Sequence, residues 1–173
     1  MVETGMHRSG VDKHEWSETF AVLRDAPTIT VLGLMSHFAC ADDPTHPHND
    51  HQESEFREAL ACARDMGLEC PINHLANSPA ALTRPSARFD QVRVGVALYG
   101  LEPVAGREHG LAPAMSWESS VVAVKPISAG ESTSYGLTWT AESDRYLATV
   151  AVGYADGLPR DVQGALHVGL GGE

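Results

Sequence analysis

Cysteine is scarce in this sequence, and long apolar runs are missing from it. The three cysteines are odd in number and form no CxxC pair, so we expect reduced thiols and a cytoplasmic location rather than a disulfide framework. No apolar run approaches the roughly 20 residues that a membrane-spanning helix needs. The first ten residues lack the basic start and apolar core of a secretory signal. These absences predict a cytoplasmic protein with no membrane partner.

Positive charge is also scarce, and it is carried almost entirely by arginine. Twelve lysines and arginines oppose 23 aspartates and glutamates, which gives a net charge of -11. A surface this acidic repels phosphate backbones, so nucleic acid is excluded as a partner. Hydrophobic residues make up 43% of the chain and charged residues 20%, a balance typical of globular proteins and unlike that of disordered ones.

The first half of the sequence alternates between helical and strand patterns. Apolar residues at three- and four-residue steps predict two helices and one helical turn, which cover 11–24, 50–68 and 79–83. Short apolar runs predict three buried strands, which cover 29–38, 71–76 and 89–99. Asp50 and Glu53 have the spacing of a capping box at the start of the second helix. The alternation of strand and helix predicts parallel βα units.

The pattern changes after about residue 112. Short β-prone stretches then follow each other directly, separated by turn residues, and they cover 118–125, 132–135, 146–153 and 164–169. This predicts a mostly antiparallel β region. We therefore expect a domain boundary that separates residues 1–112 from residues 113–173. Three βα units are too few to close a barrel, which needs about 250 residues, so both ends of the sequence are expected to continue in a longer protein.

Polar residues follow the predicted strands where a βα fold carries its functional groups. His37, in MSHFACAD, lies at the carboxyl end of one strand, and in βα barrels that end forms the active site; a structural histidine is equally plausible. Ser78, in HLANS, opens a helical turn, where free N–H groups favour phosphate, although a plain N-cap serine is more common. Arg93 lies inside a predicted strand, where a buried charge needs a partner, and an ion pair in the core is one explanation. Gly95 has no side chain and lets another group approach the backbone closely.

Three further segments carry candidate functional groups. Tyr135 lies in the turn-rich motif GESTSYG; a tyrosine acts as a general base only with help from its neighbours, and a packing role is the commoner alternative. Arg8 lies in the glycine-bounded motif TGMHRSG, where anion binding and plain surface exposure are equally plausible. Residues 42–51 gather histidines and aspartates, but the fixed spacing of metal ligands is absent, so we expect a solvated loop and no metal.

Taken together and in order, these motifs resemble those of alanine racemases. The resemblance runs through TGMHRSGV, MSHFACAD, HLANS, DQVRVGVALYG, LAPAMSWES, GESTSYGLTW and GYADGLPR. It implies an α/β fold in which the second half of a (β/α)8 barrel is followed by the start of a mostly antiparallel β domain. It also implies pyridoxal 5′-phosphate (PLP) as cofactor, interconversion of L- and D-alanine, and a supply of D-alanine for peptidoglycan. The intact family forms homodimers in which each active site is completed by the other subunit's β domain.

The resemblance implies catalytic roles for three residues and a supporting role for a fourth. Tyr135 resembles the base that handles the Cα proton of the L-substrate, and His37 resembles the histidine beside the cofactor that supports this tyrosine. Arg93 resembles the arginine that pairs with the pyridine nitrogen, and His74 resembles the partner of that arginine. An arginine in place of the usual carboxylate keeps this nitrogen unprotonated, because a guanidinium offers only donors.

Binding roles are implied for five more residues. Ser78, Gly95 and Val96 resemble phosphate-binding positions. Arg8 resembles the arginine near the cofactor's phenolic oxygen and the substrate carboxylate. Tyr154, in GYADG, resembles a residue of the corridor through which the substrate enters.

The sequence departs from the family in its lysines. In the family, the second base is the lysine that holds the cofactor covalently, and it lies in the first barrel strand. Neither Lys13 nor Lys125 lies in a comparable motif, and Met1 stands where many members carry another lysine. We therefore expect the 173-residue chain to be inactive alone. Two alternatives stay open: a non-catalytic PLP- or phosphate-binding module derived from the racemase fold, and a racemase acting on another small amino acid such as serine.

Overall fold

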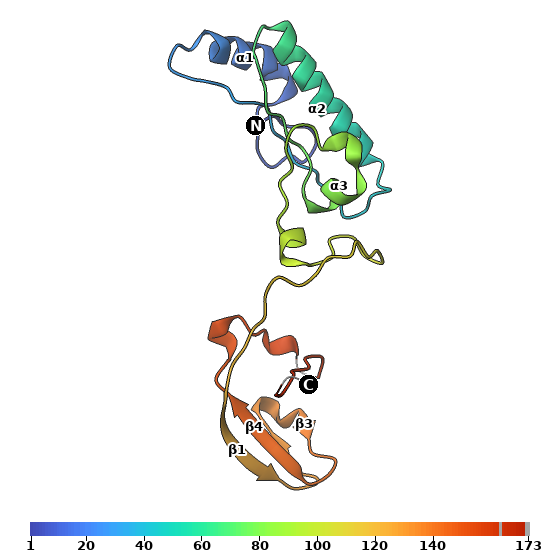
Figure 1. Ribbon diagram of the computed structural model, residues 1–173, viewed down its shortest axis with the longest axis vertical. Coiled ribbons are helices and arrows are strands. Elements are labelled where there is room, and N and C mark those ends of the chain that lie inside the picture. Colours follow the sequence, from blue (N-terminus) through green and yellow to red (C-terminus); the bar gives the residue numbers. More distant parts are fainter. Residues whose placement is uncertain (163, 172–173) are drawn as a thin grey trace. The chain divides into compact units, whose positions relative to one another are not determined.

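The computed structural model describes residues 1–162 and 164–171, and these divide into two compact units (Figure 1). The first unit is Met1–Met115 and the second is Ser116–Glu173. The first unit contains the α-helices, which are α1 (Trp16–Asp25), α2 (His48–Asp65) and α3 (Ser78–Thr83). It also contains three short 3-10 helices, which are Lys13–Glu15, Pro85–Ala87 and Val96–Tyr99. Among the described residues the structure is therefore mixed α/β, with the α-helices in the first unit and the regular strands in the second.

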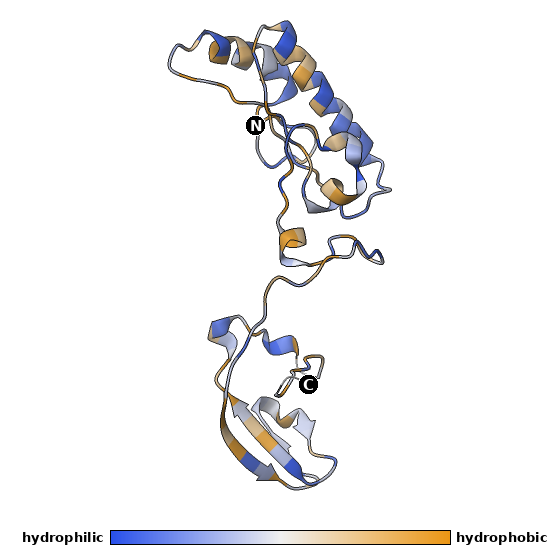
Figure 2. Cartoon of the chain, in the orientation of Figure 1, coloured by the Kyte–Doolittle hydropathy of each residue, from blue (hydrophilic) through white to orange (hydrophobic). Residues whose placement is uncertain are grey.

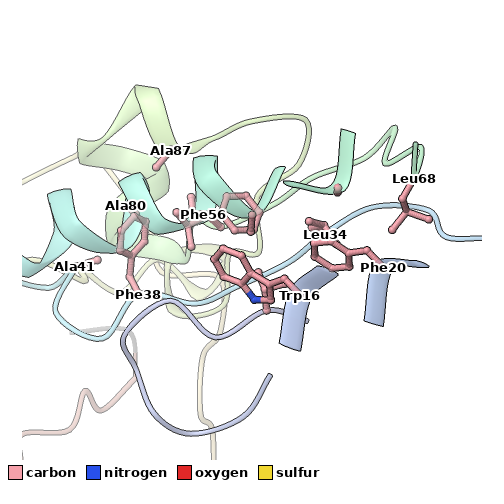
Figure 3. Packing of buried hydrophobic residues seen from close by; sticks show 14 residues of the cluster. Trp16, Phe20, Leu34, Phe38, Ala41, Phe56, Leu68, Ala80 and Ala87 are labelled. Atoms are coloured by element: carbon pink, nitrogen blue, oxygen red, sulfur yellow. The ribbon is translucent and has the colours of Figure 1, made fainter. Parts of the chain in front are cut away.

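The core of the first unit lies between α1, α2 and the extended segments beside them. Trp16 and Phe20 of α1 face Phe56 of α2, with Leu34 packed against them (Figure 3). Their spacing along each helix places them on one face, as the periodicity predicts. Figure 2 shows the same division along α2, where hydrophobic and hydrophilic residues alternate. Full burial of one such aromatic side chain stabilises the fold by about 1.5–3 kcal/mol. The predicted helices are thus confirmed.

The predicted capping box at the start of α2 is wrong. The N-cap residue is Pro47, with no side-chain cap hydrogen bond. Asp50 and Glu53 instead form ion pairs with Arg84, which follows α3. The ion pairs with Arg84 are favoured over a local capping hydrogen bond, because a charge-assisted bond to a guanidinium is stronger than a hydrogen bond to an exposed backbone N–H.

The three predicted strands of the first half are not regular strands. The segments around Met35 and His74 form a single parallel bridge, and Val2 N–H also donates to the Met35 carbonyl at 2.9 Å. Arg93 N–H donates to the Ala76 carbonyl at 3.0 Å. The segments therefore lie side by side in the order expected of parallel βα units, but only short parts of each are paired.

Local side-chain bonds explain why these ladders are interrupted. Leu34 N–H donates to the side chain of Asn73 rather than to a backbone carbonyl, and the Asn73 backbone N–H donates to Asp90. Asparagine and aspartate compete in this way with regular pairing. In the predicted strand 89–99, extended pairing is also excluded for the last part, because Val96–Tyr99 is a 3-10 helix that ends on Gly100 with φ 77°.

The second unit consists of two antiparallel strand pairs, as the sequence predicts. Strand β1 (Val121–Ile127) pairs with β4 (Arg145–Val150), and β2 (Ser132–Thr133) pairs with β3 (Trp139–Thr140). The short β3 was not predicted, and the predicted strand at 164–169 is wrong, since no strand forms in that described stretch. Figure 2 shows hydrophobic residues along β1 and β4, and several of them, including Val122 and Val124, are exposed.

Glu53 provides a test of the ionic contacts that join α2 to the segment after α3. Its carboxylate accepts hydrogen bonds from Arg57 at 2.7 Å, Arg84 at 2.6 Å and Ser86 at 3.1 Å. We expect Glu53→Gln to lower the free energy of unfolding by about 1–3 kcal/mol, because the buried carboxylate that accepts from both guanidinium groups is replaced by a neutral amide. Thermal or urea denaturation measures the change.

The pH dependence of this contact has a definite sign. Burial raises the pKa of Glu53, but the hydrogen bonds from Arg57, Arg84 and Ser86 outweigh burial and bring the pKa below its ordinary value. The stabilisation is therefore fully present above the ordinary pKa and is lost as the pH falls through the folded-state pKa. Glu58→Gln, which removes an exposed partner of Lys13, is the control and should change stability little. Equal losses in the two variants would contradict the assignment.

Candidate functional site

The guanidinium of Arg93 joins two histidines that are distant in sequence. Its Nη1 lies 2.5 Å from His74 Nδ1, and its Nη2 lies 3.0 Å from His37 Nδ1 and 2.6 Å from the Ser36 carbonyl oxygen. Because arginine has only donors, both Nδ1 atoms must accept, so both rings are neutral and carry their hydrogen on Nε2. We call Arg93, His37 and His74 the Arg93 cluster.

The electrostatics of the Arg93 cluster agree with neutral imidazoles. Burial lowers the pKa of His37, and the charges of Arg93 and Arg8 lower it further. Burial and the charge of Arg93 also lower the pKa of His74. A lowered pKa keeps each ring uncharged at neutral pH, so each Nδ1 lone pair stays available to Arg93.

Arg93 carries a half-buried positive charge with no carboxylate partner among the described residues. It takes part in none of the ion pairs found there. Burial and the charge of Arg8 lower the pKa of Arg93, so the two arginines are close enough to affect each other. An unpaired buried charge is costly, and two neighbouring cations favour an anion or a strong lone-pair acceptor between them. The sequence analysis offered an ion pair in the core as one explanation for Arg93. Among the described residues, Arg93 forms hydrogen bonds to histidines and a carbonyl, and no ion pair.

Ser78 faces the backbone of the segment after Arg93 rather than capping its own helix. The N-cap of α3 is Asn77, whose side chain accepts from Ala80 N–H. Ser78 is buried, and its Oγ accepts from Gly95 N–H at 2.8 Å. This contact brings Ser78 together with Gly95 and with Val96, the first residue of the next 3-10 helix.

Space beside Gly95 is open. A Cβ added there meets no heavy atom within 4 Å, so the described residues do not crowd this backbone. A hydroxyl and backbone N–H groups around an uncrowded glycine form the kind of surface that phosphate groups bind. The fold thus places the three predicted phosphate-binding residues together, close in sequence to Arg93.

Arg8 lies in an exposed loop whose backbone is well held. The Glu3 carboxylate accepts from the N–H groups of Gly5 and Met6, and Thr4 Oγ1 lies 2.7 Å from Ser36 Oγ in a buried contact. The loop therefore connects directly to the strand segment that carries His37. Its position, together with the electrostatic effect of Arg8 on His37 and Arg93, associates Arg8 with the Arg93 cluster.

Tyr135 and Tyr154 belong to the second unit, whereas the other candidate residues belong to the first. Tyr135 is 73% exposed, and the Arg160 guanidinium lies over its ring at 5.6 Å. The residue before it, Ser134, has φ 71°, a left-handed conformation that is strained for a non-glycine residue. Tyr154 is exposed and begins the 3-10 helix Tyr154–Asp156.

Two polar residues of α2 that the sequence analysis did not single out contact these segments. Gln52 is fully buried and bonds to the backbone on both sides of Phe38. His48 bonds to the Gly5 carbonyl. The sequence did contain a signal for Gln52. It lies four residues before Phe56, so the helical period predicts that this polar side chain lies on the buried face of α2 and needs hydrogen-bond partners there.

The expected solvated loop at 42–51 is only partly correct, because residues 48–51 of this histidine-rich segment form the first turn of α2 and Asn49 is buried there. Across residues 1–162 and 164–171, no group of three histidine, cysteine or acidic side chains is arranged to hold a metal ion. In the same part of the chain, every helix is too short or too polar to cross a membrane.

Comparison with protein families places both units. Residues 1–103 match the family model described as "Alanine racemase, N-terminal domain", and residues 114–173 match "Alanine racemase, C-terminal domain". Among curated proteins, the alanine racemase of Corynebacterium glutamicum (strain R) is 56% identical over 171 residues, which cover 99% of this chain and 47% of the relative. The alanine racemase of Mycobacterium avium (strain 104) is 46% identical over 99% of this chain and 45% of its own length. The chain spans about half the length of these relatives.

Solved structures show the same similarity. The crystal structure of alanine racemase from Corynebacterium glutamicum matches with a TM-score of 0.76 and 52% identity, over 94% of this chain and 42% of that one. The structure of alanine racemase from D-cycloserine-producing Streptomyces lavendulae matches with a TM-score of 0.83 and 40% identity, over 93% and 44%.

Proposed function

This chain belongs to the alanine racemase family, and we propose on that premise that it supplies cofactor- and substrate-binding residues of a PLP-dependent enzyme that interconverts L- and D-alanine. One observation carries the proposal. Arg93 has no carboxylate partner in the described residues, donates to two neutral imidazoles and lies near the charge of Arg8. Such a site suits a ligand that brings both a ring-nitrogen acceptor and negative charge.

The residues fit PLP by the chemistry of their donors. The N–H groups of Arg93 suit the lone pair of the pyridine nitrogen. The Ser78 hydroxyl accepts from Gly95 N–H and can donate its own hydrogen, and the open space beside Gly95, next to Val96, suits the phosphate. Arg8 suits the carboxylate of the amino acid and the phenolic oxygen of the cofactor.

Different residues of this chain have different roles in the proposed reaction. When bound, PLP withdraws electrons from the substrate as Cα loses its proton. Arg93 has no proton-accepting atom, so it leaves the ring nitrogen unprotonated and limits that withdrawal, which favours return of the proton over side reactions. Tyr135 moves the proton on the face of the L-substrate, with His37 beside the cofactor supporting it. His74 holds Arg93 in place, and Tyr154 lines the entrance corridor.

The wider setting follows from the family. We infer that residues 1–112 form the second half of a (β/α)8 barrel and that residues 113–173 begin the β domain. We also infer a homodimer in which Tyr135 completes the partner's site, and a cytoplasmic enzyme that supplies D-alanine for peptidoglycan. The three cysteines, which are all free thiols, agree with that compartment.

A chimera tests the proposed function. The 171 matching residues of the Corynebacterium glutamicum alanine racemase are replaced by those of this chain, and formation of D-alanine from L-alanine is measured. We expect racemisation, and parallel assays with L-serine define substrate breadth. A folded chimera that binds PLP without racemising any amino acid would support the non-catalytic binding module instead.

The 173-residue chain alone should bind PLP without a covalent link. Lys13 Nζ contacts Glu58 at 2.7 Å and Glu55 at 2.9 Å, and these hydrogen bonds raise its pKa, so the amine stays protonated and is a poor nucleophile. Lys125 lies on the exposed β1 of the second unit. Treatment with one equivalent of PLP and then borohydride should leave no pyridoxyl-lysine by mass spectrometry, with no racemisation. A stoichiometric adduct with turnover would overturn this expectation; the full-length relative is the positive control.

A further inference from the structure

The first two turns of α2 bury polar side chains where an amphipathic helix normally buries apolar ones. Asn49, Gln52 and Glu53 are all less than one-tenth exposed, whereas the later part of α2 buries phenylalanine and alanine. Buried polar groups are costly unless specific partners satisfy them. Glu53 pairs with arginines, as described above. The partners of Gln52, and of the adjacent His48, lie in the segments that carry His37 and Arg8.

Gln52 holds the backbone around His37 from both sides. Its Nε2 donates to the His37 carbonyl at 2.9 Å, and its Oε1 accepts from Ala39 N–H at 2.8 Å. A neighbouring strand would offer the same pair of one donor and one acceptor to this backbone. The parallel pairing of this segment ends at Ser36, whose N–H donates to the His74 carbonyl. The amide of Gln52 therefore continues the pairing one step further, at the residue whose ring contacts Arg93.

His48, one turn earlier on α2, holds the loop that carries Arg8. Its Nε2 lies 2.7 Å from the Gly5 carbonyl oxygen, and since a carbonyl only accepts, the ring nitrogen donates. The contact is close: a Cβ at Gly5 would lie 2.9 Å from Cε1 of His48, and the backbone there has φ 116°. Only glycine suits this position while the His48 ring occupies its place. The loop is thereby fixed to the same helix that fixes His37.

We propose that His48 and Gln52 are positioning residues of the Arg93 cluster and the neighbouring Arg8, with Gln52 orienting His37 beside Arg93 and His48 holding the Arg8 loop. That the site binds PLP rests on the proposed function, whereas the contacts of His48 with Gly5 and of Gln52 with the backbone around His37 are made within this chain. A helix that merely needed to pack would bury apolar residues at these positions. Instead, one turn of α2 bonds to two loops far apart in sequence, and both loops carry charge or imidazole to the same cluster.

The test for Gln52 reads the imidazoles directly by NMR in the complete 173-residue chain. Burial, Arg93 and Arg8 keep the pKa of His37 below its ordinary value. In Gln52→Met the ring is released from Arg93, so the pKa of His37 should rise, while that of His74 stays. Gln52→Leu also removes both the donor and the acceptor without adding charge, so it should show the same effect and serves if the methionine variant does not fold. Ser54→Ala, on the exposed face of α2, should leave both histidines unchanged.

The test for His48 compares His48→Leu with His14→Leu, an identical change at an exposed histidine of the first unit that lies outside α2. Leucine has no donor for the Gly5 carbonyl, so the loop is released and the effect of Arg8 weakens, and only His48→Leu should raise the pKa of His37. PLP is the binding probe, and we expect about tenfold weaker binding in His48→Leu only, the size expected from one lost hydrogen-bonded contact.

The outcomes separate this proposal from the proposed function. A His37 titration that is unchanged in a folded Gln52 variant, or changed equally by His48→Leu and His14→Leu, overturns the positioning roles. If the titrations shift as expected while the parent chain fails to bind PLP, the positioning roles stand and the cofactor assignment to this chain fails.

Discussion

Replacing Tyr135 with phenylalanine in the chimera should slow racemisation of alanine by about 10²–10⁴-fold, the usual effect of losing one general base, while PLP stays bound. The phenol hydroxyl is the only group removed, and the ring, its exposure and its contact with Arg160 are kept. The rate is measured as D-alanine formed, and cofactor content is measured by absorbance. The change tests the role of the hydroxyl alone.

The loss should be asymmetric between the two substrates. Removal of the Cα proton from L-alanine is the step assigned to Tyr135, so exchange of that proton with solvent deuterium should fall more than exchange from D-alanine. Tyr146→Phe is the matched control, because Tyr146 is an equally exposed tyrosine in the same unit. Near-normal turnover of L-alanine by the Tyr135 variant, or equal losses in both variants, would remove Tyr135 from the mechanism.

Replacing Arg93 with glutamate should lower kcat/KM of the chimera by about 10²-fold or more, the size of effect seen when an active site loses a preorganised donor. The carboxylate also lets the ring nitrogen hold a proton, so side reactions should increase. Pyruvate formed per D-alanine formed measures transamination against racemisation, and this ratio should rise. Arg107→Glu makes the same change at an exposed arginine of the first unit and should leave the ratio unchanged.

The same substitution has an expected effect on the histidines. Arg93 is one of the charges that lower the pKa of His37 and of His74, so both values should rise in Arg93→Glu and, by less, in Arg93→Met. When the pKa of each histidine moves back toward its ordinary value, the imidazole stays neutral over a narrower pH range. If neither histidine titration moves, the contacts of Arg93 with both rings are wrong.

The outcome for the helices and strands shows which elements are locally encoded. Trp16, Phe20 and Phe56 recur at helical steps, and helices form there, since a helix makes its own backbone bonds and needs only one apolar face. The strand predictions failed in the first unit because strand pairing depends on partners distant in sequence, and Asn73 and Asp90 take some of those bonds with their side chains. Antiparallel pairs in the second unit were easier to predict, since their partners follow each other along the chain.

The sequence by itself determined the family and the identity of the candidate groups, because motifs such as MSHFACAD and GESTSYG depend only on residue order. Local periodicity also determined the helices. Only the tertiary structure decided that Arg93 bonds to both His37 and His74, that Ser78 faces Gly95 rather than capping α3, and that Gln52 holds the backbone around His37. These contacts join residues far apart in the chain, and their energies arise from burial and from hydrogen-bond geometry, which residue order does not contain.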